Sequence, residues 1–207
     1  MANTNNPFGF RWHGTAGDGV TPSSGIIVAK VASGNTTTFG EGDPLSQVSA
    51  TGYVTAFTAG TSGYNLIGVF KSCEYYSTSQ GRKIYKNYWP GSDATGDVTV
   101  HLYSCIGAVN PRFLVQSSGV AAHTLSSVGL NIDITSASST AGTVTGGFYR
   151  SACTVGLLAS ASTTTSLPFR IVQLYSDIAA PGSPGADTAS AYNWLLVQPN
   201  NYAVQGV

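Results

Sequence analysis

The stretch LIGVFKSCEYYSTSQGRKIYKNYWPG, at residues 66–91, is the part of the sequence that most clearly indicates the fold class. It predicts one strand, a polar turn around Gly81 and a second strand rich in Tyr and Trp, ended by Pro90 because proline cannot donate to a ladder. Five aromatic residues lie between Tyr75 and Trp89, and the stretch also holds four of the nine basic residues, which are Lys71, Arg82, Lys83 and Lys86. We therefore expect a rigid aromatic hairpin with a positively charged tip, which suits docking on another protein better than catalysis.

The composition of the whole chain favours strands and an uncharged surface. Only 9% of the 207 residues are charged and the formal net charge is zero, so we expect no nucleic acid and no membrane as partner. Abundant Thr, Tyr, Val and Gly favour strands and turns over helices. A neutral surface of this kind suits a component of an assembly, although a secreted Thr- and Ser-rich β domain has the same composition.

The cysteines and the N-terminal sequence bear on the compartment. Cys73, Cys105 and Cys153 are widely spaced and form no CxxC or Cys/His metal pattern. They are expected to be buried thiols of a protein made in a reducing cytoplasm. The first ten residues lack the basic and apolar regions of a signal peptide, and no apolar run approaches the roughly 18 residues that span a bilayer.

Short strands separated by Gly- and Pro-rich turns are expected along the chain. Besides the second strand of the hairpin, they are predicted at 25–31, 52–57, 66–76, 97–106, 112–116, 131–135, 148–158, 168–176 and 193–198. No stretch sustains the period of an amphipathic helix. The pattern predicts an all-β sandwich or barrel with long loops. Residues 1–19 would form an extended N-terminal arm and residues 20–207 a single domain, with a Ser/Thr-rich loop region at about 117–146.

The aromatic residues of the predicted arm share one face. Phe8, Phe10 and Trp12 alternate with Gly9 and Arg11, and alternate residues of an extended segment point the same way. Such an arm either is pinned against a neighbouring subunit or packs on its own domain, and the sequence leaves both interpretations open.

No catalytic or metal-binding constellation is evident. The sequence contains no G-x-S-x-G, which argues against an α/β-hydrolase, and its three histidines lack metal-ligand spacing. Glu41 with Asp43, or Asp93 with Asp97, offers paired carboxylates, but both pairs stand beside Gly or Pro, where acidic residues usually cap turns. We therefore predict no catalytic residue, no metal and no cofactor.

The eleven Tyr and three Trp residues are typical both of a protein interface and of a sugar-binding surface. Tyr88 and Trp89 have the polar side chains of Asn87 and Asp93 nearby, as a glycan site would. Tyr75, Tyr85 and Trp89 are equally well interpreted as core residues of the hairpin.

Several short motifs in a fixed order resemble the head decoration, or cement, proteins of tailed bacteriophages. These motifs are NPFGFR near the N-terminus, FG-x-GDP and GDPL (42–45), GVF-x2-C-x-Y…YWPG, PRFLVQ (111–116), LPFRIVQLY (167–175) and AYNWLLVQPNN (191–201). The resemblance covers most of the chain, and its ordered set is more specific than any single motif. The Ser/Thr-rich region at 117–146 departs from the pattern.

The resemblance implies a jelly-roll-like sandwich and a non-enzymatic virion protein. Such a protein is made in the host bacterial cytoplasm, sits on the capsid exterior as a homotrimer and binds the major capsid protein. The expected interface residues are Phe8, Phe10, Arg11, Trp12, Lys71, Arg82, Lys83, Lys86 and Trp89. Two alternatives stay open, namely a glycan-binding β domain of a phage fibre or host-attachment protein, and a phage-associated hydrolase.

Overall fold

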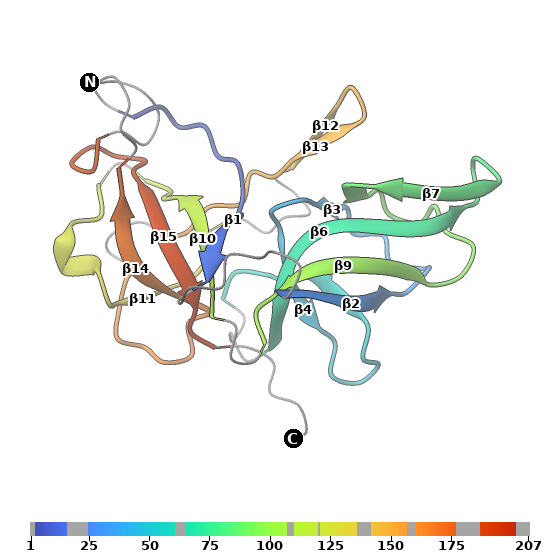
Figure 1. Cartoon of the computed structure of the whole chain (residues 1–207), viewed down its shortest axis with the longest axis horizontal. Coiled ribbons are helices and arrows are strands. Elements are labelled where there is room, and N and C mark those ends of the chain that lie inside the picture. Colours follow the sequence, from blue (N-terminus) through green and yellow to red (C-terminus); the bar gives the residue numbers. More distant parts are fainter. Residues whose placement is uncertain are drawn as a thin grey trace.

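The computed structural model describes residues 3–15, 25–60, 65–106, 110–119, 121–135, 142–156, 160–176 and 187–201. The named strands are all antiparallel and lie in two lobes (Figure 1). We call the described residues between 25 and 106 the barrel lobe, and those of 3–15 with those between 110 and 201 the terminal lobe. The all-β prediction is confirmed, whereas the jelly-roll arrangement stays a prediction. The described ranges contain no helix long and apolar enough to cross a membrane.

A single curled sheet forms the barrel lobe. Its strand order is β2 (Ile26–Val31), β9 (Val98–Ser104), β6 (Leu66–Ser77), β4 (Pro44–Gln47) and β5 (Val54–Ala56), and β7 (Arg82–Lys86) pairs with the far end of β6. The edge strands β2 and β5 lie close to each other, so the sheet is strongly curled, although no ladder joins these two strands among the described residues. The alternation of residues 97–106 predicts that Val98, Val100 and Leu102 face inward and that Tyr103 faces outward. The inward face is confirmed, since all three of its residues are fully buried along β9.

The predicted aromatic hairpin is present as β6 and β7. Its register runs from Cys73 opposite Lys86 to Ser77 opposite Arg82, and Gly81 at the turn has a φ of 62° that favours glycine. The chain then forms β8 (Tyr88–Trp89), which pairs with β3 (Phe39–Gly40) rather than with β6. The second predicted strand is therefore divided in two, and its last part closes over the barrel core.

The terminal lobe is built on a five-stranded sheet with a core of its own. Its order is β1 (Arg11–Thr15), β10 (Pro111–Gln116), β15 (Trp194–Pro199), β14 (Phe169–Tyr175) and β11 (Asn131–Ile132). The core includes Phe113, Ile171 and Val197, and residues of the barrel lobe such as Leu66 and Val69 also belong to it. The two lobes are therefore joined through buried apolar side chains.

A short hairpin projects from the body beside the junction of the lobes (Figure 1). It consists of β12 (Thr143–Thr145) and β13 (Phe148–Arg150), with positive φ at both Gly146 and Gly147, as a two-residue type I′ connection requires. The strand predicted over 148–158 is wrong for residues 151–156, which are mostly buried and form only the isolated bridges of Val155, and residues 157–158 lie outside the described residues. The Ser/Thr-rich region also holds a 3₁₀ turn at Leu125–Ser127. The sequence PGSPG at 181–185 predicts a surface loop because proline and glycine do not suit a ladder, and this segment lies outside the described residues.

The predicted thiols are confirmed. All three cysteines are free and buried, and burial raises the pKa of Cys73 to about 12. None of them offers a thiolate nucleophile at neutral pH.

Candidate functional site

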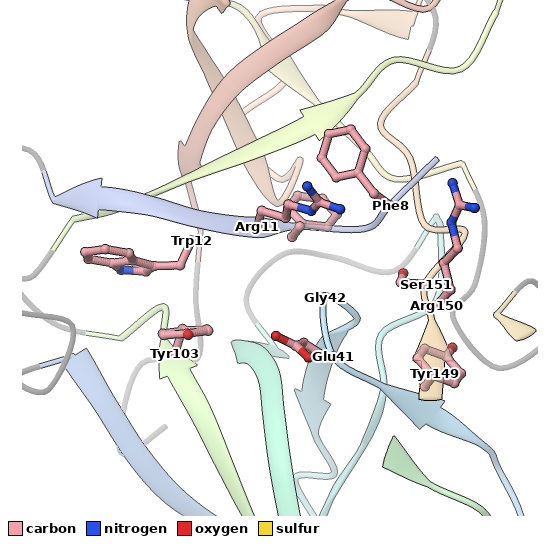
Figure 2. A pocket seen from close by; sticks show the side chains of 10 residues that line it. Phe8, Arg11, Trp12, Glu41, Gly42, Tyr103, Tyr149, Arg150 and Ser151 are labelled. Atoms are coloured by element: carbon pink, nitrogen blue, oxygen red, sulfur yellow. The ribbon is translucent and has the colours of Figure 1, made fainter. Parts of the chain in front are cut away.

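A cleft of about 480 Å³ lies between the two lobes and is the main candidate site (Figure 2). Its roof is the N-terminal segment running into β1, its floor is the β3–β4 turn with the end of β9, and β13 closes one side. The residues that line the roof and floor include Phe8, Phe10, Arg11, Trp12, Glu41 and Tyr103. Four residues of the interface expected from the sequence are thus brought together in one cleft.

Phe10 anchors the roof of the cleft in the core of the terminal lobe. Its side chain is 2% exposed, stacks on Phe169 at 4.5 Å between ring centroids and meets the Phe113 ring edge-on at 6.2 Å. Its backbone N–H donates to the Gly42 carbonyl at 2.8 Å. The predicted arm therefore packs on its own chain, and Phe10 is corrected from an interface residue to a core residue.

An aromatic pair closes one end of the cleft. Trp12 from the terminal lobe and Tyr103 from the barrel lobe lie nearly parallel, 6.2 Å between centroids and 21° between planes. Both side chains remain partly exposed. The Lys71 ammonium is 5.6 Å from the centroid of the Tyr103 ring. Burial, and secondarily the charge of Glu41, raises the pKa of Tyr103.

The charged groups of the cleft are not paired with each other. The Arg11 guanidinium lies 4.5 Å over the Phe8 ring, and no ion pair or hydrogen bond of its side chain is present within the described part of the chain. Arg150 donates to the Pro7 carbonyl at 3.2 Å and to the Asn6 side chain, so it holds the N-terminal segment in place. Glu41 accepts a bond of 3.4 Å from the Asn87 amide. Between the described residues, the one ion pair is Lys83 with Glu74, far along the hairpin.

A buried carboxyl group beside the cleft joins the lobes. Asp43 is fully buried and accepts hydrogen bonds from Gly40 N–H at 2.9 Å, from Tyr149 Oη at 2.5 Å and from Ser151 Oγ at 2.5 Å. Desolvation raises its pKa to about 6, although the three hydrogen bonds oppose the rise. The bond from Gly40 confirms that Asp43 caps its turn. The bonds from Tyr149 and Ser151 were not foreseen, because these residues lie 106 and 108 positions away.

Three chain segments meet at this carboxyl group because glycines allow close approach. A Cβ on Gly40 would lie 2.3 Å from the Tyr149 ring, and one on Gly9 would lie 2.6 Å from Ser151. Real Cβ atoms do not approach other heavy atoms this closely, so the junction depends on glycine at both positions.

Gly40→Ala tests this junction. Overpacking against the Tyr149 ring is expected to destabilise the fold by about 1–3 kcal/mol, measured as the shift in urea midpoint. Gly34→Ala is the matched control, because a Cβ on Gly34 meets nothing within 4 Å. If the two variants unfold at the same denaturant concentration, the close approach of the lobes does not contribute to stability.

The hairpin residues of the expected interface are placed apart from the cleft, with the exception of Lys71. Arg82 bonds to Gln80 at the tip, Lys83 pairs with Glu74 at 2.9 Å, and the Lys86 ammonium lies 5.0 Å from the Tyr88 ring centroid. Trp89 is fully buried, with its indole N–H donating to the Asn35 carbonyl at 3.2 Å. Trp89 is therefore corrected to a core residue, and the glycan site considered around it is not supported by its burial.

The cleft contains one exposed carboxylate, Glu41, among the described lining residues. Hydrolysis of a glycosidic bond usually requires two carboxyl groups flanking the bond, and the nearby Asp43 is sealed from solvent. Asp93, the other acidic residue weighed from the sequence, caps a turn by accepting bonds from Ser77 Oγ and from the Ser79 N–H. No group of metal-ligating side chains occurs within the residues described.

Sequence reasoning missed Tyr103, Arg150 and the pair of Tyr149 and Ser151. Tyr103 stands on the outward face of the predicted β9 segment, so its exposure was foreseen but its partner Trp12 was not. Arg150 and Ser151 lie in a segment that was predicted to be one continuous strand.

Comparison of the chain with protein-family models, with curated proteins and with solved structures gave no match.

Proposed function

We propose that this protein is a non-enzymatic structural protein of a phage virion that binds the outer surface of the capsid as a homotrimer and cements subunits of the major capsid protein. The observation that carries the proposal is the β6–β7 hairpin, which exposes aromatic and basic side chains on a body with few charges. The ordered motifs that resemble decoration proteins support the major capsid protein as the partner.

The outer face of this hairpin carries both aromatic and basic side chains, and hydrogen bonds hold its two tyrosines in place. Tyr76 is 51% exposed and Tyr85 is 65% exposed, and the register places Tyr76 opposite Lys83. The Tyr85 hydroxyl donates to Ser72 Oγ at 2.6 Å, and the Tyr76 hydroxyl donates to the Gly81 carbonyl at 2.5 Å. Aromatic side chains already held in place lose little conformational freedom on binding, and Tyr is enriched among the residues that dominate interfaces.

The cationic tip supports binding to an acidic surface. Arg82 is exposed, and Lys83 has 71% of its side chain exposed although it pairs with Glu74. Charges at the rim of an interface contribute to orientation and association rate more than to affinity. Repetition of a modest contact in a closed trimer supplies avidity, so no single contact needs to be strong.

The double variant Tyr76→Ala, Tyr85→Ala tests the proposal in co-sedimentation with phage heads that lack the protein. Wild-type protein is expected to bind saturably and to prefer expanded heads, and the variant is expected to bind at least tenfold more weakly, a loss of about 1.4 kcal/mol. Val28→Ala on the exposed face of β2 is the control, since Val28 is 62% exposed and lies on a different edge of the sheet. Absence of wild-type binding to either form of head would refute capsid binding.

A further inference from the structure

We propose that the β12–β13 hairpin joins two copies of this chain by antiparallel pairing of β12 with β12 of the second copy, centred on Val144. The contact is isologous, so it forms pairs and does not close a three-membered ring. In the homotrimer proposed above, it would link neighbouring trimers on the capsid surface. The inference rests on that proposed function only for the local concentration of copies, and the contact itself is tested on the free protein.

The outer edge of β12 is unpaired among the described residues. β12 and β13 form a sheet of two strands, and all three residues of β12 are exposed. Figure 1 shows the hairpin projecting away from the strands of both lobes. A two-stranded hairpin is marginally stable by itself in water, and an unpaired edge is a template for a further strand.

The register of the hairpin decides which backbone groups lie on this edge. The two-residue turn at 146–147 has φ angles of 60° and 83°, so the residues that flank it, Thr145 and Phe148, exchange the first ladder hydrogen bonds. Hydrogen-bonded and non-hydrogen-bonded pairs alternate along an antiparallel ladder, and the next pair, Val144 with Tyr149, is therefore non-hydrogen-bonded. The N–H and C=O of Val144 point away from β13, toward the free edge, and neither bonds to another described segment.

This edge is its own complement across a two-fold axis. The donor and acceptor of Val144 match the acceptor and donor of the same residue in a second copy, so two hydrogen bonds form around the axis. The two valine side chains then lie opposite each other on one face of the sheet, where such cross-strand pairs are stabilising. Val144 is 46% exposed in the single chain, so the contact covers an apolar side chain that otherwise stays in water.

The edge lacks the features that keep edge strands apart. Lysine, proline or an inward-pointing charge usually protects such an edge, whereas no charged residue and no proline occurs between Asp133 and Arg150. The formal net charge of the chain is zero, so two copies approach each other without general repulsion. A charged partner finds no opposite charge on β12, which favours a second copy as the occupant.

The base of the hairpin is fixed, so the edge is presented in one orientation. Tyr149 donates to the buried Asp43 at 2.5 Å, and Arg150 donates to the Pro7 carbonyl at 3.2 Å. A segment that is already ordered loses little conformational freedom on binding. A strand of three residues makes a small contact, so we expect pairing where copies are held at high local concentration.

Disulfide cross-linking of the free protein tests the pairing. Residues that form a hydrogen-bonded antiparallel pair have Cα atoms about 5.5 Å apart, a separation that a disulfide spans. Val144→Cys is therefore expected to form a disulfide dimer under mild oxidation at least tenfold faster than Leu125→Cys. Leu125 is the matched control because it is 80% exposed in the 3₁₀ turn, and the three native cysteines are buried. Equal rates for the two variants would overturn the proposal.

Two further substitutions of Val144 separate its backbone from its side chain. Val144→Pro removes the outward N–H but no bond of the hairpin's own ladder, whereas Val144→Thr keeps both the N–H and the branched shape. In sedimentation equilibrium, Val144→Pro is expected to need at least tenfold more protein than the wild type to reach the same average mass, and Val144→Thr is expected to match the wild type. Wild-type association of Val144→Pro, or an equal loss in Val144→Thr, would place the contact elsewhere.

Head co-sedimentation is scored separately from these measurements. Failure of the wild type to bind heads would refute capsid binding, and cross-linking of the free protein would still decide whether β12 pairs with β12.

Discussion

Replacing Phe10 by alanine is expected to lower the free energy of unfolding by about 3–5 kcal/mol, the usual cost of deleting a buried aromatic ring. The ring is 2% exposed and lies between Phe113 and Phe169 of the terminal lobe. Its removal leaves a cavity in the core and releases the N-terminal segment from the cleft. The loss is therefore one of global stability, as well as of any binding that uses Arg11 or Trp12.

Urea unfolding followed by tryptophan fluorescence measures this loss. Phe148→Ala is the matched control, since Phe148 is 74% exposed at the tip of the β12–β13 hairpin and its truncation is expected to change stability by no more than about 0.5 kcal/mol. If Phe10→Ala and Phe148→Ala unfold at the same urea concentration, the N-terminal segment is not part of the folded core. The alternative of an arm that binds a neighbouring subunit would then be favoured.

The parts of the fold that the sequence predicted are those with local signals. Strict alternation identified the buried face of β9, and the glycine turn between two aromatic runs identified the β6–β7 hairpin. Both features rest on residues close in the chain, where the period of two and the turn chemistry are visible. The burial of the three cysteines was expected on a different ground, because free cysteine is among the most buried residue types.

The arrangement of the cleft depends on contacts between distant residues and was not predictable in detail. The alternation of Phe8, Phe10 and Trp12 indicated one aromatic face, but not that Phe10 would enter a core formed by Phe113 and Phe169. The positive φ of 74° at Gly9 changes the direction of the chain between the first two rings. The alternation of aromatic residues is compatible both with a segment that packs on its own chain and with an arm that binds a neighbouring subunit. Only the tertiary contact distinguishes the two.

Asp43 is a second residue whose environment depends on distant residues and is not predictable from its local sequence. Its place in Gly-Asp-Pro predicts a turn cap, and the bond from Gly40 is that cap. Its full burial arises from Tyr149 and Ser151, which reach it from the other lobe. The sequence holds no local sign that this acid, unlike Asp93 or Asp97, is removed from water.

The second large effect is a pH dependence of stability caused by Asp43. Its pKa is raised from 3.8 to about 6 in the folded protein, so the folded state binds the proton more tightly than the unfolded state. Stability therefore falls as the pH rises through the window from about 4 to 6, and stays level above it. A shift of about two pH units corresponds to about 3 kcal/mol.

Asp43→Asn isolates this contribution. An asparagine oxygen still accepts from Gly40 and Tyr149, and its amide donates to the Ser151 hydroxyl, which can reverse its role; the group no longer titrates. The variant is expected to lose less stability than the wild type between pH 4 and pH 7, with the difference between them changing by about 3 kcal/mol. Thermal and urea unfolding at several pH values measure it, and the exposed Asp97→Asn serves as control. Parallel stability curves for wild type and Asp43→Asn would show that the buried carboxyl group keeps an ordinary pKa, and that its three hydrogen bonds offset its desolvation.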